Sequence, residues 1–194
     1  KIALPILSHI LIESQENAIR LTATDLDIGI SCVIPVEIQE PGAITIPAKR
    51  FGDIIKELPS DDIAISTKKN NLVFIDAEPC QFKLMGLSRE EFPKLPEFKD
   101  KEAILLEQPI LKQMLNLTSF AVSFDESRYI LNGILFKISK NNLELVATDG
   151  KRLAVIKKEL KQGTEKDTQI IVSIKTIQEL NRSLKDEGEL MLVL

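Results

Sequence analysis

The sequence is poor in the residues on which most catalytic and metal sites depend. Its 194 residues include one His, two Cys, one Tyr and no Trp. The lone His9 lies in an apolar stretch without a Ser-His-Asp arrangement, and Cys32 and Cys80 do not have the spacing of a C-x-x-C metal site. No glycine-rich phosphate loop is present either. We therefore expect no catalytic activity, no metal and no cofactor, and an enzyme site completed by another chain stays open as an alternative.

Long apolar runs and a secretion signal are also missing. No run of about 18 apolar residues occurs, so no membrane-spanning helix is expected. The N-terminal stretch KIALPILSHILIES has neither a basic region nor a small-residue cleavage site. Two cysteines without a secretory signal are typical of reduced thiols, so we expect a cytoplasmic location and no membrane. Because the sequence starts without Met, a removed or truncated segment stays an open alternative.

An excess of basic residues, the usual mark of nucleic-acid binding, is absent. The formal net charge is −4. Residues 1–101 hold 12 basic and 16 acidic side chains, and residues 102–194 hold 13 of each. An acidic protein binds DNA only if its basic groups collect on one face. The position of the lysines therefore matters more than their number.

What the sequence does contain is an internal duplication. LTATD, which begins at Leu21, recurs as LVATD at Leu145, an offset of 124 residues. The stretch ITIPAKRFGDIIKEL at residues 44–58 aligns with IIVSIKTIQELNRSL at residues 170–184, an offset of 126. Ordered matches at near-constant spacing predict two copies of one unit, each long enough to be a domain. We place the first domain at residues 1–101 and the second at residues 102–194.

Hydrophobic periodicity predicts the same elements in both copies. Helices are expected at Ala48–Leu58, Pro109–Phe120 and Lys175–Lys185, with apolar side chains every three or four residues. The remaining predicted elements are strands, among them Ile6–Glu13, Ile19–Asp25, Tyr129–Ile138 and Leu143–Thr148. Each complete copy is therefore an α+β domain of mainly antiparallel strands with two helices on one face. Residues 87–101, with two prolines, are interpreted as the interdomain linker, with an ordinary surface loop as the alternative.

The equivalent helices carry equivalent cations. Lys49 and Lys56 are seven residues apart, and at offset 126 they correspond to Lys175 and Arg182. Seven residues are two helical turns, so each pair shares one face, away from the apolar stripe, and can reach neighbouring phosphates. The alternative is that these side chains only solvate an exposed face.

Six motifs in order resemble the bacterial DNA sliding clamp family, the β subunit of DNA polymerase III. They are LPILSHILIE, LTATDLDIGI, ITIPAKRFGDIIKELP, FPKLPEF, DESRYILNGILF and LVATDGKRLA, and they span nearly the whole chain. The resemblance implies duplicated clamp domains with antiparallel sheets outside and two helices per domain lining a pore. Complete chains of that family have three such domains. This chain therefore looks like a fragment, with a first domain that lacks its N-terminal segment and a second domain truncated at its C-terminus.

The resemblance also implies two binding sites. The family's DNA-contacting positions correspond to Lys1, Lys49, Arg50 and Lys175, while one such position is occupied by Ile174; Lys56 and Arg182 join them through the repeat. The family's groove for short hydrophobic peptides corresponds to Leu131, Thr148, Gly150, Lys151, Arg152 and Leu153, with Lys151 where a His is frequent. The groove's other wall is expected from residues beyond Leu194. Leu131 and Leu153 as ordinary core residues are the alternative.

The function that the resemblance implies is that of a DNA polymerase processivity factor. The full-length protein would be a homodimeric ring that encircles double-stranded DNA independently of sequence. Its expected protein partners are the DNA polymerase III alpha subunit, the clamp loader delta subunit, and other clamp-binding polymerases and repair proteins. The rival hypothesis is a non-catalytic peptide-binding scaffold that does not bind DNA.

Overall fold

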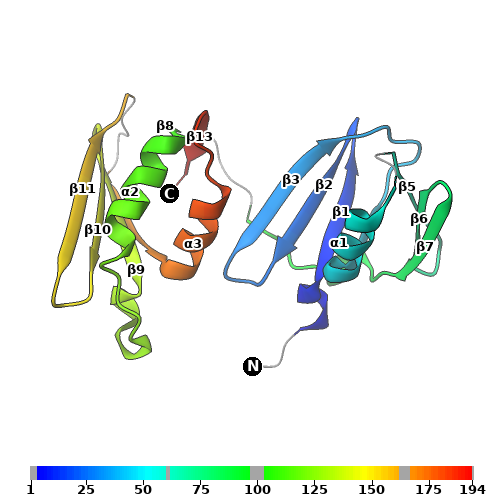
Figure 1. Ribbon diagram of the computed structural model, residues 1–194, viewed down its shortest axis with the longest axis horizontal. Helices are drawn as coiled ribbons and strands as arrows, with labels where there is room; N and C mark the ends of the chain where they lie inside the picture. The colour runs from blue at the N-terminus through cyan, green and yellow to red at the C-terminus, as the bar shows by residue number, and fades with distance from the viewer. Residues whose placement is uncertain (1–3, 60–61, 97–102, 162–166, 194) are drawn as a thin grey trace. The chain divides into compact units, whose positions relative to one another are not determined.

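The computed structural model describes residues 4–59, 62–96, 103–161 and 167–193, which form two compact units (Figure 1). The first unit comprises residues 1–96 and the second comprises residues 97–194. All strand pairings among the described residues are antiparallel, and helices pack against the sheets of their own unit. The predicted α+β class with duplicated domains is therefore confirmed.

The first unit contains a four-stranded sheet of order β3-β2-β1-β4 and a three-stranded sheet of order β5-β6-β7. The strands are β1 (His9–Gln15), β2 (Ala18–Thr24), β3 (Gly29–Pro35), β4 (Ala43–Pro47), β5 (Ala64–Thr67), β6 (Leu72–Ala77) and β7 (Cys80–Met85). Helix α1 (Ala48–Glu57) follows β4 directly and contacts β1 and β4. Pro47 precedes its first residue, as expected for a residue that has no backbone N–H to leave unpaired.

The main core of the first unit lies between α1 and both sheets. Its buried members are Ile12, Ile44, Ile46, Val73, Ile75 and Leu84. Phe51, Ile54 and Leu58 pack against this cluster, as their helical spacing predicts. No residue of α1 is fully buried, so the helix is held by one partly covered stripe.

The opposite face of the four-stranded sheet is covered by residues from the predicted linker. Phe92 is buried in a second cluster with Ile6 and Leu11. Leu87 and Thr45 exchange two backbone hydrogen bonds, of 3.1 and 3.0 Å. A short 3-10 helix, η2 (Arg89–Glu91), lies between these contacts. Residues 87–92 therefore pack as part of the first unit, and the last part of the predicted linker, residues 97–101, lies outside the described residues.

Two predicted strands begin later than the sequence suggested. Residues Ile6–Glu13 start with the 3-10 helix η1 (Pro5–Ser8), because Pro5 has no N–H for a sheet ladder and its φ suits a helical turn. Residues Tyr129–Ile138 start within the 3-10 helix η4 (Glu126–Leu131). Asp125 caps η4, since its Oδ1 accepts a 3.0 Å hydrogen bond from the Ser127 N–H. In both places local backbone chemistry outweighs the apolar pattern.

The second unit repeats the first with an additional helix. Its sheets have the orders β11-β10-β9-β12 and β13-β8. The strands are β8 (Ile104–Glu107), β9 (Gly133–Ser139), β10 (Asn142–Thr148), β11 (Leu153–Glu159), β12 (Thr168–Ser173) and β13 (Glu189–Leu192). The helices are α2 (Gln108–Ser119) and α3 (Ile174–Ser183), and they contact each other and the four-stranded sheet. Both predicted helices are present, with ends one or two residues earlier.

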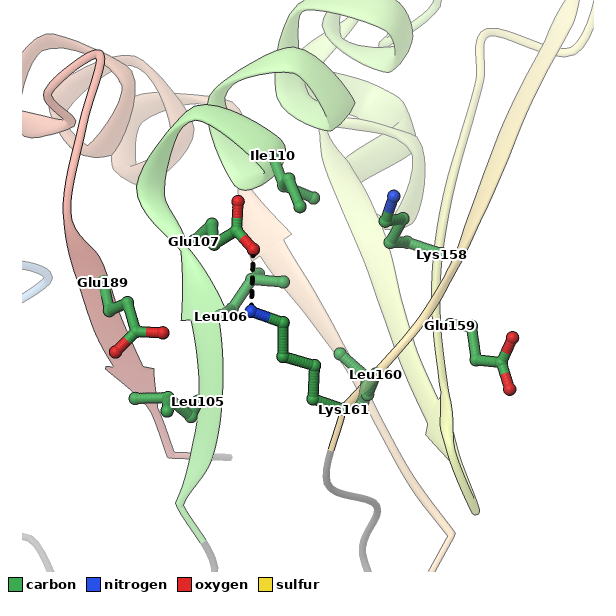
Figure 2. A pocket seen from close by; sticks show the side chains of 9 residues that line it. All are labelled: Leu105, Leu106, Glu107, Ile110, Lys158, Glu159, Leu160, Lys161 and Glu189. Carbon is green, nitrogen blue, oxygen red and sulfur yellow. Dashed lines mark ion pairs between the residues drawn. The ribbon is translucent and has the colours of Figure 1, made fainter.

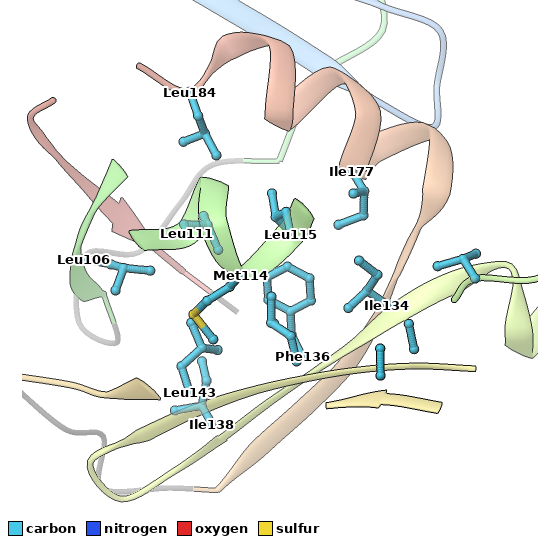
Figure 3. Close-up of a cluster of buried hydrophobic side chains, with 14 of the residues drawn as sticks. Leu106, Leu111, Met114, Leu115, Ile134, Phe136, Ile138, Leu143, Ile177 and Leu184 are labelled. Atoms are coloured by element: carbon cyan, nitrogen blue, oxygen red, sulfur yellow. The ribbon is translucent and has the colours of Figure 1, made fainter. Parts of the chain in front are cut away.

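A single core joins both helices to the sheets of the second unit (Figure 3). Leu111, Met114 and Leu115 of α2 and Ile177 of α3 point into it, and each is at most 2% exposed. Phe136 lies at its centre, 1% exposed. Packing α2 and α3 on the sheet turns their remaining faces, which carry the cations and amides, toward solvent.

Candidate nucleic-acid and peptide interfaces

Three exposed cations lie on α1. Lys49, Arg50 and Lys56 are all exposed, and none forms an ion pair with an acidic side chain of the described residues. Asp53 lies between them on the same helix and is exposed as well. The helix is therefore amphipathic, with an apolar stripe on the core and a face of net positive charge.

Helix α3 presents the corresponding pair. Ser173 caps its N-terminus, where the hydroxyl accepts a 3.2 Å hydrogen bond from the Thr176 N–H. Lys175 and Arg182 are exposed two turns apart, as predicted. Arg182 is held in an ion pair, with its Nη1 2.7 Å from Glu179 Oε1. Ile174, at the position where the family's DNA-contacting cation is lost in this sequence, is half-buried and packs against the core.

The two helices thus share one pattern, an apolar stripe inside and two cations seven residues apart outside. Cations in this arrangement suit contacts with phosphates, which fix position without reading sequence. Lys1, the remaining candidate, lies outside the described residues.

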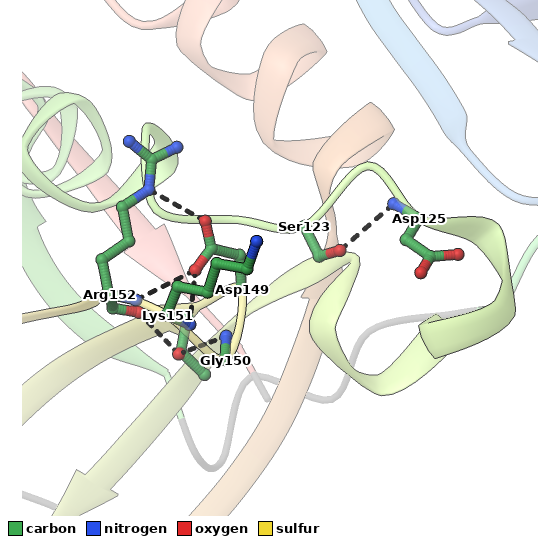
Figure 4. A network of polar contacts seen from close by, with 7 residues as sticks. Ser123, Asp125, Asp149, Gly150, Lys151 and Arg152 are labelled. Atoms are coloured by element: carbon green, nitrogen blue, oxygen red, sulfur yellow. Dashed lines mark hydrogen bonds and ion pairs between the residues drawn. The ribbon is translucent and has the colours of Figure 1, made fainter.

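A polar turn joins β10 to β11 and contains most of the predicted peptide-binding residues (Figure 4). The Thr148 hydroxyl donates to Arg152 O at 2.6 Å and accepts from Gly150 N at 3.0 Å. Asp149 Oδ1 accepts from the backbone N–H groups of Lys151 and Arg152, at 2.9 and 3.0 Å. These two hydrogen bonds hold the pKa of the Asp149 carboxyl below its usual 3.8. The backbone conformation of the turn is thus fixed by hydrogen bonds from the side chains of Thr148 and Asp149.

Asp149 also directs the Arg152 side chain. Its Oδ2 lies 3.0 Å from Arg152 Nε. The guanidinium of Arg152 is 5.5 Å from the ring centroid of Phe120, which makes a cation–π contact. Gly150 has φ = +88°, a left-handed conformation that suits glycine. Through its two backbone hydrogen bonds, Asp149 caps this turn.

An open pocket lies beside this turn. Its lining residues are Val122, Ser123, Phe124, Asp125, Arg128, Asp149, Lys151 and Arg152. Of the six predicted peptide-binding residues, Lys151 and Arg152 line it. Leu131 is half-buried, and Leu153 is 65% exposed on the edge strand β11, so Leu153 is not a core residue.

The sequence did not predict that the segment before β9, at residues 122–128, lines one side of this pocket. Phe124 is 74% exposed and Arg128 lies on η4, about 25 residues before the turn in sequence. The available signal was an aromatic residue within the polar stretch SFDES, where a buried role is not expected. Three cationic side chains and an exposed phenyl ring line this pocket, and two of the cations are paired with lining carboxylates, Arg128 with Asp125 at 3.8 Å and Arg152 with Asp149 at 3.0 Å.

A second pocket of this unit lies between β8, β13 and the end of β11, and the sequence did not predict it (Figure 2). Leu105, Leu106 and Ile110 form its apolar part. Lys161 crosses it to Glu107, with 2.9 Å between Nζ and Oε1, and this hydrogen bond raises the pKa of Lys161 above 10.5. The ion pair ties the end of β11 to β8, which is a structural role.

Two kinds of feature are absent from the described residues. Among them, no group of three or more His, Cys, Asp and Glu side chains is placed to hold a metal ion. None of their helices combines the length and the apolar character needed to cross a membrane.

Comparisons with known proteins place both units in one family. Residues 1–96 match the model of the DNA polymerase III beta subunit N-terminal domain, and residues 105–194 match the model of its central domain. The beta sliding clamp of Chlamydia pneumoniae is 39% identical over 186 residues, covering 96% of this chain and 51% of that protein. A beta sliding clamp of Staphylococcus aureus is 37% identical over 194 residues, again covering 51% of its length.

Solved structures give the same result. The DNA polymerase III subunit beta of Pseudomonas aeruginosa has a TM-score of 0.92 and 34% identity, over 98% of this chain and 53% of that one. The DNA polymerase sliding clamp of Bacillus subtilis has a TM-score of 0.93 and 32% identity, over 98% and 53% of the two chains. The chain spans about half the length of the relatives it matches.

Proposed function

The chain belongs to the family of bacterial beta sliding clamps, and from this premise we propose that its two units are clamp domains of a ring that encircles duplex DNA. The observation that carries the proposal is the repeated cationic helix face, with Lys49 and Lys56 on α1 and Lys175 and Arg182 on α3. Lys1 and Arg50 complete the proposed DNA-binding set. The two helices would line the pore of the full-length homodimer.

The proposed mechanism is retention by topology combined with weak phosphate contacts. Each lysine or arginine that neutralises a phosphate releases counterions, so affinity falls steeply with salt and carries no sequence preference. Base contacts would hold the protein at one site, whereas exposed helix cations let it move along the duplex. The ring itself would keep polymerases near the primer end by raising their effective concentration. The protein would act without catalysis, in the cytoplasm.

The turn at Thr148–Leu153 and its adjacent pocket are the proposed site for partner proteins. Leu131 and Leu153 would supply apolar contacts, and Lys151 and Arg152 would supply donors at the rim. Thr148 and Gly150 would fix the turn, as their hydrogen bonds indicate. Short hydrophobic peptides of the DNA polymerase III alpha subunit, of the clamp loader delta subunit and of other clamp-binding polymerases and repair proteins are the proposed ligands.

The test compares retention of the full-length protein on circular and linear DNA after loading. We expect retention on circles and on linear DNA with blocked ends, and rapid loss from free ends. Charge reversal to Glu at Lys49, Lys56, Lys175 and Arg182 should abolish loading or processive synthesis. The same reversal at four exposed lysines outside these helices, Lys68, Lys69, Lys137 and Lys157, is the matched control. Equal retention on open and blocked ends would overturn the ring, and full activity of the helix variant would favour the scaffold without DNA binding.

A further inference from the structure

The two equivalent cationic helices differ in how their second cation is held. At offset 126, Lys56 corresponds to Arg182 and Asp53 corresponds to Glu179. On α3 the pair is closed, with 2.7 Å between Arg182 Nη1 and Glu179 Oε1. On α1 neither Lys56 nor Asp53 forms an ion pair with any described residue. The same positions of one duplicated helix thus hold a paired cation in one copy and an unpaired cation in the other.

The chemistry of the side chains explains the difference. Glu is one methylene longer than Asp, and the arginine fork presents several N–H donors to a carboxylate, whereas a lysine ammonium is a compact and strongly hydrated charge. Residues three apart on a helix are neighbours, so the longer pair closes readily. Both side chains of the closed pair remain accessible, with Arg182 73% and Glu179 40% exposed. The pair is therefore within reach of a ligand and can open at small cost.

We propose that Glu179 competes with DNA phosphate for Arg182, so that α3 holds the duplex more weakly than α1 does. The Glu179 carboxylate takes one of the five N–H donors of Arg182 and offsets its positive charge, so a phosphate that approaches this guanidinium competes with the carboxylate. When Arg182 turns to a phosphate, Glu179 is left unpaired beside a polyanion. Glu179 is then a positioning residue that acts through Arg182. This inference rests on the proposed function, because it concerns the DNA-facing role of the same helices.

The duplication supplies its own controls. Glu179→Gln removes the competitor, and Asp53→Asn removes an equivalent negative charge that forms no ion pair among the described residues. Arg182→Gln removes the cation, and the double variant Glu179→Gln with Arg182→Gln completes a double-mutant cycle. The readout is the dissociation constant of the full-length protein for a linear duplex, measured over a series of salt concentrations. Thermal unfolding of each variant separates a loss of helix stability from a change in DNA contact.

Glu179→Gln should tighten binding by up to about fivefold at low salt, since an exposed pair contributes little. It should also steepen the slope of log K against log salt by roughly 0.9, the value for one added phosphate contact. Asp53→Asn should leave that slope unchanged, and Arg182→Gln should abolish the effect of Glu179→Gln. If the wild-type protein binds and Glu179→Gln matches Asp53→Asn, the inference is wrong and the clamp function stands. If the wild-type protein shows no salt-dependent binding, the inference falls together with the proposed function.

Discussion

The two turns that follow the repeated Ala-Thr-Asp sequences have the same hydrogen bonds but different residues. In the first turn the Thr24 hydroxyl donates to Ile28 O at 2.8 Å and accepts from Leu26 N at 3.0 Å. Thr148 makes the same two bonds across the second turn. Asp25 and Asp149 each accept from the two N–H groups that follow the left-handed residue. These four side-chain hydrogen bonds occupy equivalent positions in the two turns.

The two turns differ in the residues that follow the shared Thr-Asp pair. The first turn reads Asp-Leu-Asp-Ile and places Leu26 in the left-handed position, with φ = +77°. The second reads Asp-Gly-Lys-Arg and places Gly150 there, with φ = +88°. Thr and Asp therefore build the turn in both units, whereas Lys151 and Arg152 add donors in the second unit alone. Comparing the copies thus separates the residues that build the turn from the proposed binding residues.

Removing the threonine hydroxyl that bridges each turn should have the largest effect on stability, and the loss should be greater for Thr24 in the first turn than for Thr148 in the second. Thr24 is 7% exposed, so Thr24→Val leaves the Leu26 N–H without its partner in a site with little water. The Ile28 carbonyl loses one of its two hydrogen bonds and keeps the 3.1 Å bond from Asp25 N. We expect a loss of about 1–3 kcal/mol in the free energy of unfolding. Thr148 is only half-buried, so Thr148→Val should cost less. Denaturant titration of both variants checks the order, and equal losses would show that burial does not separate the turns.

Replacing Gly150, the residue of the second turn with a positive φ, should have the next largest effect on stability. Gly150→Leu gives the second turn the residue of the first at a positive φ, which costs about 1–2 kcal/mol for a residue with a Cβ. The nearest atom to the added Cβ would be Arg128 Nη1 at 3.3 Å, the mobile end of a side chain, so packing adds little. Thermal unfolding measures the loss. Gly52→Leu, in open space on α1 and at an ordinary φ, is a control that should not be destabilising.

The reverse exchange should stabilise the protein by a smaller amount. Leu26 is 60% exposed and gives up little packing when it is removed. Leu26→Gly relieves the left-handed strain, but glycine also gains conformational freedom in the unfolded chain, which costs roughly 0.5–1 kcal/mol. A net gain of about 0.5 kcal/mol is expected from the difference. A decrease in the unfolding midpoint would mean that the Leu26 side chain has contacts that outweigh its strained backbone.

The elements that could be predicted from sequence are those whose cause is local. The turns were predictable because a Thr-Asp pair contacts its own backbone within four residues. The stripe of Phe51, Ile54 and Leu58 was predictable because helical spacing alone decides which residues share a face. Because the sequence is duplicated, the same turn and the same apolar helix stripe could be predicted in the second copy. Agreement between the copies thus strengthened predictions that were weak in either one.

The features that were missed depend on contacts between distant residues or on side-chain conformation. The linker pattern with Pro93 and Pro96 gave no sign that Phe92 packs with Leu11, about 80 residues earlier. Phe124 and Arg128 reach the pocket from a segment that the turn sequence does not contain. The pairing of Arg182 with Glu179 but not of Lys56 with Asp53 depends on side-chain length and conformation, which a repeat of charges does not reveal.

The smallest expected effect is the response of the second turn to acid. The pKa of Asp149 is lowered below 3.8 in the folded protein by the N–H groups of Lys151 and Arg152. A carboxylate with a depressed pKa stabilises the fold above its unfolded pKa, and this contribution is lost as pH falls through the folded value. Wild-type protein should therefore exceed Asp149→Asn in unfolding free energy by a constant margin near neutral pH. That margin should shrink below about pH 4 as Asp149 takes up its proton and releases Arg152. Parallel denaturant titrations at several pH values measure it, and a margin that stays unchanged over the whole acid range in which the protein remains folded would show that the carboxylate charge is not what holds the turn.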